Sequence, residues 1–387
     1  MPPEFGLDRL AVDPPPFLRE GPVGVVTNAA ATTADLRTAV EVLLDLGVEV
    51  AIIFAPEHGF TTGVPAGERV DHQVDPLTGV PIYSLYGERF APPAEMLDGL
   101  TRIIVDLPDV GARFYTYVST LVHVLRAAAQ AGVPVLVLDR ANPIDGVSVE
   151  GPILQEGYTS FVGMLPVPVR HGMTVGELAR FANDVLDIGA SLDVIPVRKW
   201  RREEMADAWG RPWVPPSPNM PHVETALLYP GMCLVEGTNL SEGRGTPYPF
   251  AVVGAPWVDG HVLAHHLNAL GLSGVRFRPV SFLPCAGKYA GERCQGVQVH
   301  VTDRAQFRPV RTGIAILTTV RALYPESFTF PASGTKEDLR PFDRLIGNGK
   351  VRAQIEAGVP YEEIVAPWHE EEMAFRQQRR DYLFEEA

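Results

Sequence analysis

Four short apolar segments in the first 140 residues constrain the fold most strongly. They span residues 23–28, 48–54, 102–107 and 133–138. The first and last pairs enclose stretches with helical spacing of apolar residues that end at Gly47 and Gly132, and glycine is the usual residue just past a helix. Strands that alternate with helices predict βαβ units. We therefore expect an α/β fold with a Rossmann-like first domain built on a mostly parallel sheet.

Polar side chains follow each of these strands. The four clusters are Thr27-Asn28, Glu57-His58, Asp106 with Asp109, and Asp139-Arg140. In open α/β sheets, ligands bind at the carboxyl ends of the strands, so we expect these side chains to share a crevice. No G-x-G-x-x-G and no Walker A sequence follows the first strand, and no nucleotide cofactor is predicted.

Two helices have clear sequence signals. One follows the first strand and should place Leu36, Val40, Leu43 and Leu44 on its buried face. The other begins after Thr174, where Glu177 three residues later completes a capping box.

The second half of the chain predicts a second, smaller α/β domain. Its expected helices span residues 258–270 and 311–323, and its expected strands span 275–283 and 296–302. We place the boundary near residue 230, which gives domains of residues 1–230 and 231–387 with an active-site cleft between them. The final helix, rich in Arg and Glu, should pack back on the smaller domain.

The composition limits the kinds of molecule that the protein can bind. A net charge of −14 argues against nucleic-acid binding, although a local cation cluster can still hold a small anion. No apolar run approaches the roughly 20 residues of a membrane span, and no signal peptide is visible, so a cytoplasmic protein is expected unless the chain was trimmed. Cys233, Cys285 and Cys294 lack zinc-site spacing, and free thiols are favoured over a Cys285–Cys294 bridge. Oligomeric state stays open.

Glu57 is the leading catalytic candidate, and His58 beside it is expected to orient or bind the substrate. They follow a hydrophobic strand and open a Gly- and Pro-rich connection that lasts until about Pro81, and such long loops are usually functional or disordered. Partial burial raises the pKa of a carboxyl and suits it to general-acid chemistry. The alternatives are an N-cap or a surface salt bridge for Glu57, and a metal ligand for His58. No second ligand lies at metal-site spacing, so no metal is predicted.

Other polar groups have both a binding and a structural interpretation. Asp106 and Asp109 suit either a site or an Asx turn with an ion pair, and Arg170-His171 near a helix start suits a carboxylate ligand. The remaining candidates are Tyr115 and Tyr117 as an aromatic platform or core, Asn219 and Asn239 as amide or hydroxyl partners or turn stabilisers, and Glu236, Glu242 and Arg244 as a second carboxylate with a clamp.

The chain resembles the exo-β-N-acetylmuramidase family from about residue 20 to its end. The matching motifs are Pro56-Glu57-His58-Gly59, residues 109–117, residues 139–143, Arg170-His171-Gly172-Met173-Thr174, residues 216–221, residues 236–246 and Phe342-Asp343-Arg344-Leu345. The segment of residues 285–289 departs from the pattern, because a serine is expected before Lys288.

This resemblance implies an exo-acting glycoside hydrolase that releases a terminal, non-reducing N-acetylmuramic acid from a muropeptide or from a disaccharide with N-acetylglucosamine. It makes Glu57 the leading catalytic carboxylate, with Glu236, Asp106 or Glu68 opposite it. The lactyl carboxylate would bind Arg113, Arg170, His171 or Arg244, and the acetamido group Asn219 or Asn239. No cofactor is implied, and retaining, inverting and acetamido-assisted routes all stay open. The main alternative is a protein that binds a muropeptide or acidic sugar without cutting it; a nucleotide-dependent sugar transferase is disfavoured because no phosphate loop is present.

Overall fold

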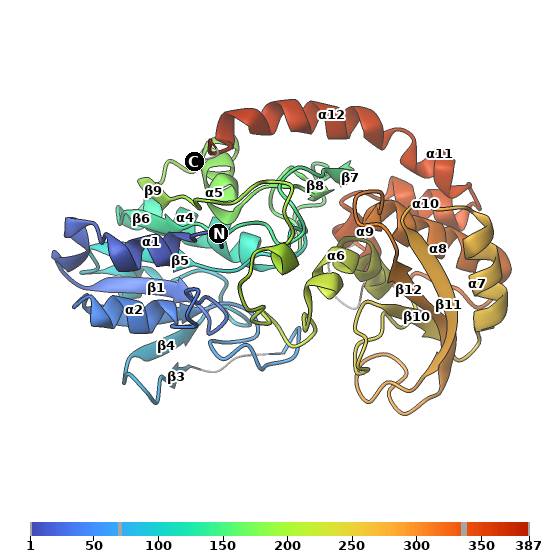
Figure 1. Cartoon of the computed structure of the whole chain (residues 1–387), viewed down its shortest axis with the longest axis horizontal. Helices are drawn as coiled ribbons and strands as arrows, with labels where there is room; N and C mark the ends of the chain where they lie inside the picture. The colour runs from blue at the N-terminus through green and yellow to red at the C-terminus, as the bar shows by residue number, and fades with distance from the viewer. Residues whose placement is uncertain (1, 69–71, 334–338, 386–387) are drawn as a thin grey trace.

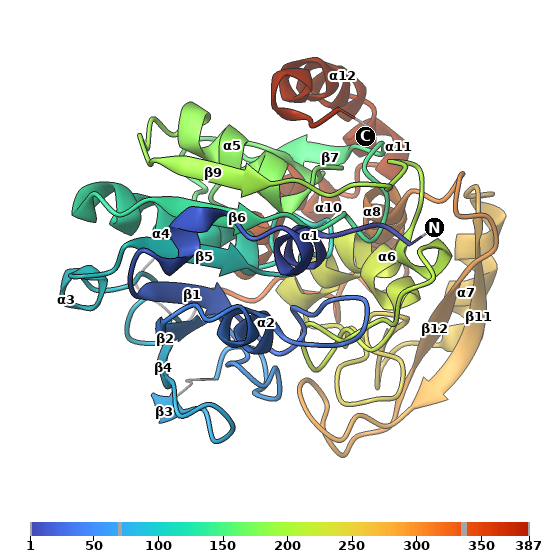
Figure 2. The same ribbon diagram turned by 60° about the vertical axis from the view of Figure 1, so that its left-hand side comes forward.

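A seven-stranded sheet forms the N-terminal domain. The computed structural model describes residues 2–68, 72–333 and 339–385. The strands are β1 (Val23–Thr27), β2 (Val50–Ala55), β3 (Gln73–Val74), β4 (Pro81–Ser84), β5 (Arg102–Asp106), β6 (Val135–Leu138) and β9 (Leu192–Ile195). Their order is β3-β4-β2-β1-β5-β6-β9, and all pairs are parallel except β3 with β4 (Figures 1 and 2). The mostly parallel, Rossmann-like sheet is confirmed.

Helices cover both faces of this sheet. Alternate residues of its strands point to opposite sides, and the apolar side chains on each side pack against helices. Val25, Ile104 and Leu136 pack with helices α1 (Gly6–Val12) and α2 (Ala39–Asp45). The neighbouring Val105 and Val137 pack on the other face with α4 (Tyr117–Ala131) and α5 (Val175–Val185). Strands that are apolar on both faces read as continuous hydrophobic runs, which explains the four segments in the sequence.

The C-terminal region contains a three-stranded antiparallel sheet in the order β10-β12-β11. These strands are β10 (Val252–Ala255), β11 (Val275–Phe282) and β12 (Cys294–Val301). The helices of this region are α6 (Val223–Met232), α7 (Gly260–Ala269), α8 (Pro309–Leu323), α9 (Pro341–Ile346), α10 (Lys350–Glu356) and α11 (Tyr361–Val365). A two-stranded ribbon of β7 (Glu150–Ile153) and β8 (Pro168–Arg170) and the short helix α3 (Ala94–Leu97) belong to the N-terminal half.

The last helix, α12 (Trp368–Gln378), does not pack only on the smaller region as expected. It crosses from that region to the N-terminal domain (Figure 1). Glu372 pairs with Arg311 of α8 at 3.0 Å and accepts a hydrogen bond from the Gly151 amide of β7 at 3.1 Å. Farther along, Arg379 donates to the carbonyl oxygen of His171 at 2.7 Å. The charged side chains of this final segment therefore bridge the two halves.

The two helices with sequence signals give different outcomes. The Thr174 capping box is confirmed, because the Glu177 amide donates to Thr174 Oγ1 at 3.2 Å and α5 starts one residue later. The helix after β1 is shorter than expected and begins only after Thr38. Leu36 lies before it with a left-handed φ of 69° and is 51% exposed, and Leu44 is 38% exposed, so the assignment of these two residues to the buried face was wrong. A capping box at Thr38 and Glu41, rather than the apolar spacing, sets the start.

Among the described residues, no helix is both long enough and apolar enough to cross a membrane. Cys233, Cys285 and Cys294 are free thiols, and Cys285 is exposed.

Candidate functional site

The turn after β2 gives Glu57 and His58 their positions. His58 and Gly59 both adopt left-handed backbone angles, with φ of 72° and 74°, and the Gly59 amide donates to the Pro56 carbonyl at 3.1 Å. A left-handed histidine is uncommon and costs backbone energy that the surrounding contacts must offset. Such strain is concentrated at functional sites, so this turn is a candidate functional site.

The Glu57 carboxylate is buried and held by two donors. Its Oε1 atom accepts a hydrogen bond from the Gly67 amide at 2.9 Å, and its Oε2 atom accepts one from Thr116 Oγ1 at 2.7 Å. Only 6% of the residue is exposed. Gly67 belongs to the long connection after β2, and Thr116 directly precedes α4. These two contacts hold the Glu57 carboxylate in one orientation.

A cavity of about 90 Å³, which we call the Glu57 pocket, lies in front of this carboxylate. The N-terminal domain contributes Glu57, His58, Tyr115, Thr116, Ser217 and Asn219 to its wall. The C-terminal region contributes Tyr229, Cys233, Glu236, Arg244 and Phe250. The pocket therefore has one wall from each half of the chain, and Glu57 and Glu236 belong to different walls.

Glu236 belongs to a network of charges. Its Oε2 atom accepts a hydrogen bond from Arg244 Nη2 at 2.8 Å, and Arg244 Nε lies 3.3 Å from Glu242 Oε1. Lys288 Nζ in turn contacts Glu242 Oε2 at 3.1 Å. Burial lowers the pKa of Arg244, but the charges of Glu236, Glu242 and other neighbours outweigh it and raise the pKa overall. Arg244 is thus a permanent cation in the wall of the pocket, beside the second carboxylate candidate.

Tyr86 lies beside this pocket, although no pattern singled it out. Burial, and then the charges of Glu57 and Glu236, raise the pKa of its hydroxyl well above the ordinary value. A phenol that stays protonated near two carboxylates is available as a hydrogen-bond donor between them.

Arg113 lies outside the Glu57 pocket, contrary to its predicted role in substrate binding. Its guanidinium is buried and donates to the carbonyl oxygens of Pro152, Val167 and Leu345, at 2.8, 2.8 and 2.9 Å. Burial lowers the pKa of Arg113 to about 9. Its hydrogen bonds join three distant segments, so the structure assigns it to the link between the two halves.

Arg170 and His171 also lie outside the pocket. Arg170 ends strand β8 rather than starting a helix, and its Nη2 atom contacts Asp145 Oδ2 at 2.8 Å while only about 1% of its side chain is exposed. The fully buried His171 accepts a hydrogen bond from the Met173 amide at 3.2 Å and faces Asp109 Oδ2 at 3.4 Å. Neither side chain is accessible to a carboxylate ligand, because each is enclosed by its own partners.

Tyr117 and Asn239 have structural hydrogen bonds instead of positions in the pocket wall. The Tyr117 hydroxyl donates to the Pro216 carbonyl at 2.7 Å and accepts from Asn28 Nδ2 at 3.0 Å. The Asn239 amide donates to the Ser327 carbonyl at 2.7 Å and accepts from the Thr329 amide at 2.9 Å. Tyr115, predicted like Tyr117 to be an aromatic platform or core, lines the pocket. Asn219, predicted like Asn239 to be an amide or hydroxyl partner or a turn stabiliser, also lines it.

The two other second-carboxylate candidates lie elsewhere. Asp106 is fully buried and holds both ends of the Arg140 guanidinium, with oxygen–nitrogen distances of 2.5 and 2.9 Å. Glu68 is exposed and does not line the pocket. Of the four strand-end clusters, only Glu57-His58 reaches the Glu57 pocket, so the expectation of one shared crevice was wrong. Glu57 belongs to the β2 side of the sheet, whereas Asp109 and Arg140 line a different cavity.

Sequence reasoning missed Thr116, Ser217, Tyr229, Cys233 and Phe250. The sequence contained a signal for two of them, since Thr116 and Ser217 lie inside motifs that carried the family resemblance. The others come from α6, the 3₁₀ turn after it and the segment before β10, where apolar side chains look like ordinary core. Among the described residues, no cluster of three or more His, Cys, Asp or Glu side chains has the arrangement of a metal site.

Comparison with known proteins assigns the family. Family models for the N-terminal and C-terminal parts of exo-β-N-acetylmuramidase NamZ match residues 23–224 and 227–384. The chain belongs to the NamZ exo-β-N-acetylmuramidase family. It is 42% identical over 381 residues to the peptidoglycan β-N-acetylmuramidase NamZ of Bacillus subtilis, which covers 98% of this chain and 91% of that protein.

Solved structures agree with this assignment. One DUF1343 family protein from Bacteroides fragilis superimposes with a TM-score of 0.91 at 32% identity, and covers 99% of this chain and 98% of its own. A second, from the same organism, has a TM-score of 0.75 at 31% identity, and covers 100% of this chain and 99% of its own. Glu57 and Glu236 line one pocket of a chain whose family is named for an activity that cleaves a glycosidic bond.

His58 provides a pH-dependent test of the pocket. Its Nδ1 atom lies 2.7 Å from the Val64 carbonyl, which can only accept a hydrogen bond, so Nδ1 carries the proton and Nε2 is left as an acceptor. Burial lowers the pKa of His58 below 6.5, with opposing contributions from Val64 and Glu57. As pH falls below 6.5 toward that lowered pKa, the ring gains a proton, Nε2 ceases to accept, and the folded state also loses stability relative to the unfolded chain.

We expect kcat/KM to decline on this acid side and the decline to be smaller in His58→Asn. Asparagine suits the test because it tolerates the left-handed backbone that His58 adopts. Rates measured from pH 4.5 to 8, with NMR titration of the His58 ring in the parent protein, check both parts. An identical acid limb in the two proteins would show that another group controls it.

Proposed function

We propose that the chain hydrolyses the bond that links a terminal β-N-acetylmuramic acid to a peptidoglycan fragment, with Glu57 as the proton donor. The relative from Bacillus subtilis is named for this activity. The observation that carries the assignment here is that the buried Glu57 shares one pocket with Glu236, which comes from the other half of the chain. Glycoside hydrolysis generally uses two carboxyl groups on either side of the bond that breaks.

Thr116 and Gly67 support this role by orienting the Glu57 carboxylate. An oriented acid needs little reorganisation when the leaving-group oxygen accepts its proton. Glu236 would act on the other face, as a base toward water, as a nucleophile, or by stabilising an acetamido-assisted intermediate. Arg244 offsets the charge of Glu236, and Tyr86 can donate a hydrogen bond between the two carboxylates.

Arg244 is the group best suited to the lactyl carboxylate of muramic acid. Among the described residues that line the Glu57 pocket, it is the only lysine or arginine. Its Nη2 and Nε atoms face Glu236 and Glu242, and its Nη1 atom forms no hydrogen bond within the described part of the chain. Asn219, half-buried and in the wall that the N-terminal domain contributes, would bind the acetamido group.

The specificity of the pocket tests this assignment. We expect Arg244→Gln to lower kcat/KM for an aryl N-acetylmuraminide by roughly 10- to 100-fold more than for the matching N-acetylglucosaminide. A hydrogen bond to a charged group contributes about 1.5–3 kcal/mol, and only the muraminide carries the carboxylate. Arg244→Lys, which keeps the charge, serves as the control and should recover part of the preference. Equal losses on both substrates would remove Arg244 from the carboxylate site.

The alternative, a protein that binds such fragments without cutting them, predicts a different outcome. Intact disaccharide after long incubation with the parent protein, together with tight binding by calorimetry, would support binding alone. Release of free N-acetylmuramic acid, detected by mass spectrometry, is the result that we expect.

A further inference from the structure

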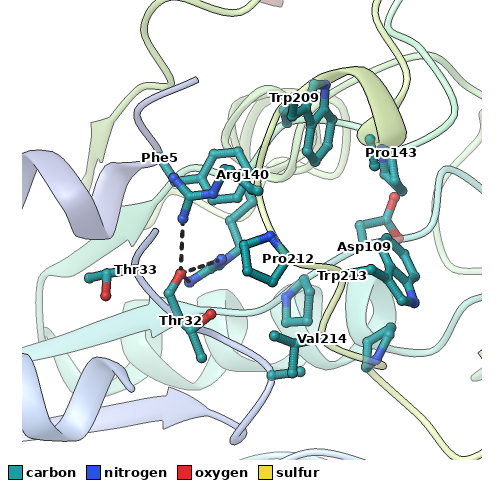
Figure 3. A pocket seen from close by; sticks show the side chains of 16 residues that line it. Phe5, Thr32, Thr33, Asp109, Arg140, Pro143, Trp209, Pro212, Trp213 and Val214 are labelled. Atoms are coloured by element: carbon teal, nitrogen blue, oxygen red, sulfur yellow. Dashed lines mark hydrogen bonds between the residues drawn. The ribbon is translucent and has the colours of Figure 1, made fainter. Parts of the chain in front are cut away.

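A second cavity lies at the topological switch point of the large sheet. Strand β1 is flanked by β2 on one side and β5 on the other, so the loops after β1 and β5 lead away from each other. In open α/β sheets this divergence opens a crevice at the carboxyl ends of the strands, and ligands bind there. We call this cavity the switch-point crevice. Ala30 and Thr32 after β1, Asp109 after β5, and Ala141 after β6 line it (Figure 3).

The roof of the crevice is apolar and aromatic. It comes from a single segment, residues 206–216, which places Trp209, Pro212, Trp213 and Val214 over the strand ends (Figure 3). The cavity measures about 60 Å³, whereas a single water needs about 10–15 Å³. Mostly apolar walls with a few polar groups are the usual character of a small-molecule site.

Two buried polar atoms in this lining have no hydrogen-bond partner among the described residues. Asp109 Oδ1 is an acceptor in a residue that is 6% exposed, and Trp209 Nε1 is a donor in one that is 7% exposed. The other Asp109 oxygen is occupied, because it accepts from the Gly111 amide at 2.8 Å. Leaving both an acceptor and a donor unpaired is costly inside a protein. Both atoms have almost no accessible surface, so a bound molecule with both kinds of group would pair with them after a small shift of the two side chains.

The charges of the crevice exclude an anionic ligand. Its two arginines are already neutralised, Arg140 by both oxygens of Asp106 and Arg211 by Asp8 at 2.6 Å. Both guanidinium groups also donate to the Thr32 carbonyl. The polar atoms that remain, a carboxylate oxygen and an indole N–H, suit hydroxyl or amide groups.

We propose that the switch-point crevice binds a neutral sugar ring, with its apolar face against the tryptophans and a hydroxyl or amide donated to Asp109. The site is distinct from the Glu57 pocket and does not depend on the function proposed for it. A turn separates the two cavities: Pro216 lines the crevice, the next residue, Ser217, lines the Glu57 pocket, and Trp213 Nε1 bonds the Met220 carbonyl at 2.9 Å.

Tryptophan fluorescence tests this proposal directly. Trp209 and Trp213 line the crevice, whereas no tryptophan is among the described residues that line the Glu57 pocket. Titration of the full chain with N-acetylglucosamine should give a saturable change in emission. Ala141→Leu fills the crevice without removing a polar group, and should weaken this binding at least tenfold while muraminide hydrolysis stays within about twofold. Val214→Phe, on the half-buried rim, provides a second block if Ala141→Leu melts early.

Ala66→Leu is the matched control, because Ala66 lines the Glu57 pocket instead. It should leave the fluorescence titration unchanged. The proposal is overturned if N-acetylglucosamine gives no saturable change, or if the folded Val214→Phe and Ala141→Leu proteins both bind it as the parent does. A response to methylammonium chloride but not to the sugar would assign the crevice to a cation and likewise contradict a neutral sugar.

Discussion

Glu57→Gln should lower turnover of an aryl N-acetylmuraminide by about 10²–10⁴-fold, the range that general acid catalysis supplies. Glutamine keeps the shape of the side chain: its one oxygen can accept from the Gly67 amide while its NH2 group donates to Thr116 Oγ1, but it has no acidic proton to give. Steady-state rates at several pH values measure the loss, and a thermal melt establishes that the variant is folded.

Glu68→Gln is the matched control for this variant, since Glu68 belongs to the same connection but is exposed and outside the pocket. It should keep parental activity. A Glu57→Gln protein that retains more than about a tenth of parental turnover would exclude Glu57 as the proton donor. A leaving group with a low pKa, such as nitrophenol, needs less acid assistance, so the natural disaccharide should show the larger loss.

Arg113→Met should destabilise the protein by about 2–4 kcal/mol. Methionine keeps much of the apolar volume but leaves the carbonyls of Pro152, Val167 and Leu345 without their donors, and each unpaired buried group costs about 1–3 kcal/mol. Part of this cost is offset, because burial of the Arg113 charge is itself unfavourable and lowers its pKa to about 9. Urea denaturation, followed by far-UV circular dichroism, measures the free energy of unfolding.

The control is Arg89→Met, which removes an exposed arginine whose Glu95 partner lies 3.5 Å away and should change stability by less than about 0.5 kcal/mol. The result also separates two roles for Arg113. A residue that binds substrate would show a raised KM with unchanged stability, and that outcome would restore the role predicted from sequence. Loss of stability with KM unchanged in the remaining folded protein supports the structural link.

The sheet could be predicted from the sequence because its strands and helices are indicated by residues that lie close together in the chain. The chain has four runs of β-branched and aliphatic residues, with segments of helical apolar spacing between them that end at Gly47 and Gly132. This pattern has few alternatives to a parallel sheet covered on both faces. The left-handed glycines at these two positions, with φ of 72° and 69°, end helices where expected. The start of α2 was missed because a capping box at Thr38 competed with the apolar pattern of Leu36.

The sequence also singled out Glu57, the residue that we propose as the acid. Glu57 follows a buried strand by two residues, and the length of the loop after it marks the turn as more than a connection. The sequence does not show which partners the side chains at a strand end contact. Asp106 and Asp139 have the same local context as Glu57, yet Asp106 holds Arg140, and Asp139 accepts from the Gly176 amide at 2.7 Å.

The sequence by itself determined the class of fold, the strand ends and the carboxylate at the centre of the proposed site. Only the tertiary structure decided which arginine faces the pocket. Arg113 and Arg170 lie in family motifs as Arg244 does, but their partners come from residues 25 to 232 positions away, including backbone carbonyls that every sequence contains. A guanidinium binds a carbonyl, an internal carboxylate or a ligand with the same donors. Its role therefore depends on which of these the fold brings within about 3 Å, and that is a property of packing rather than of residue type.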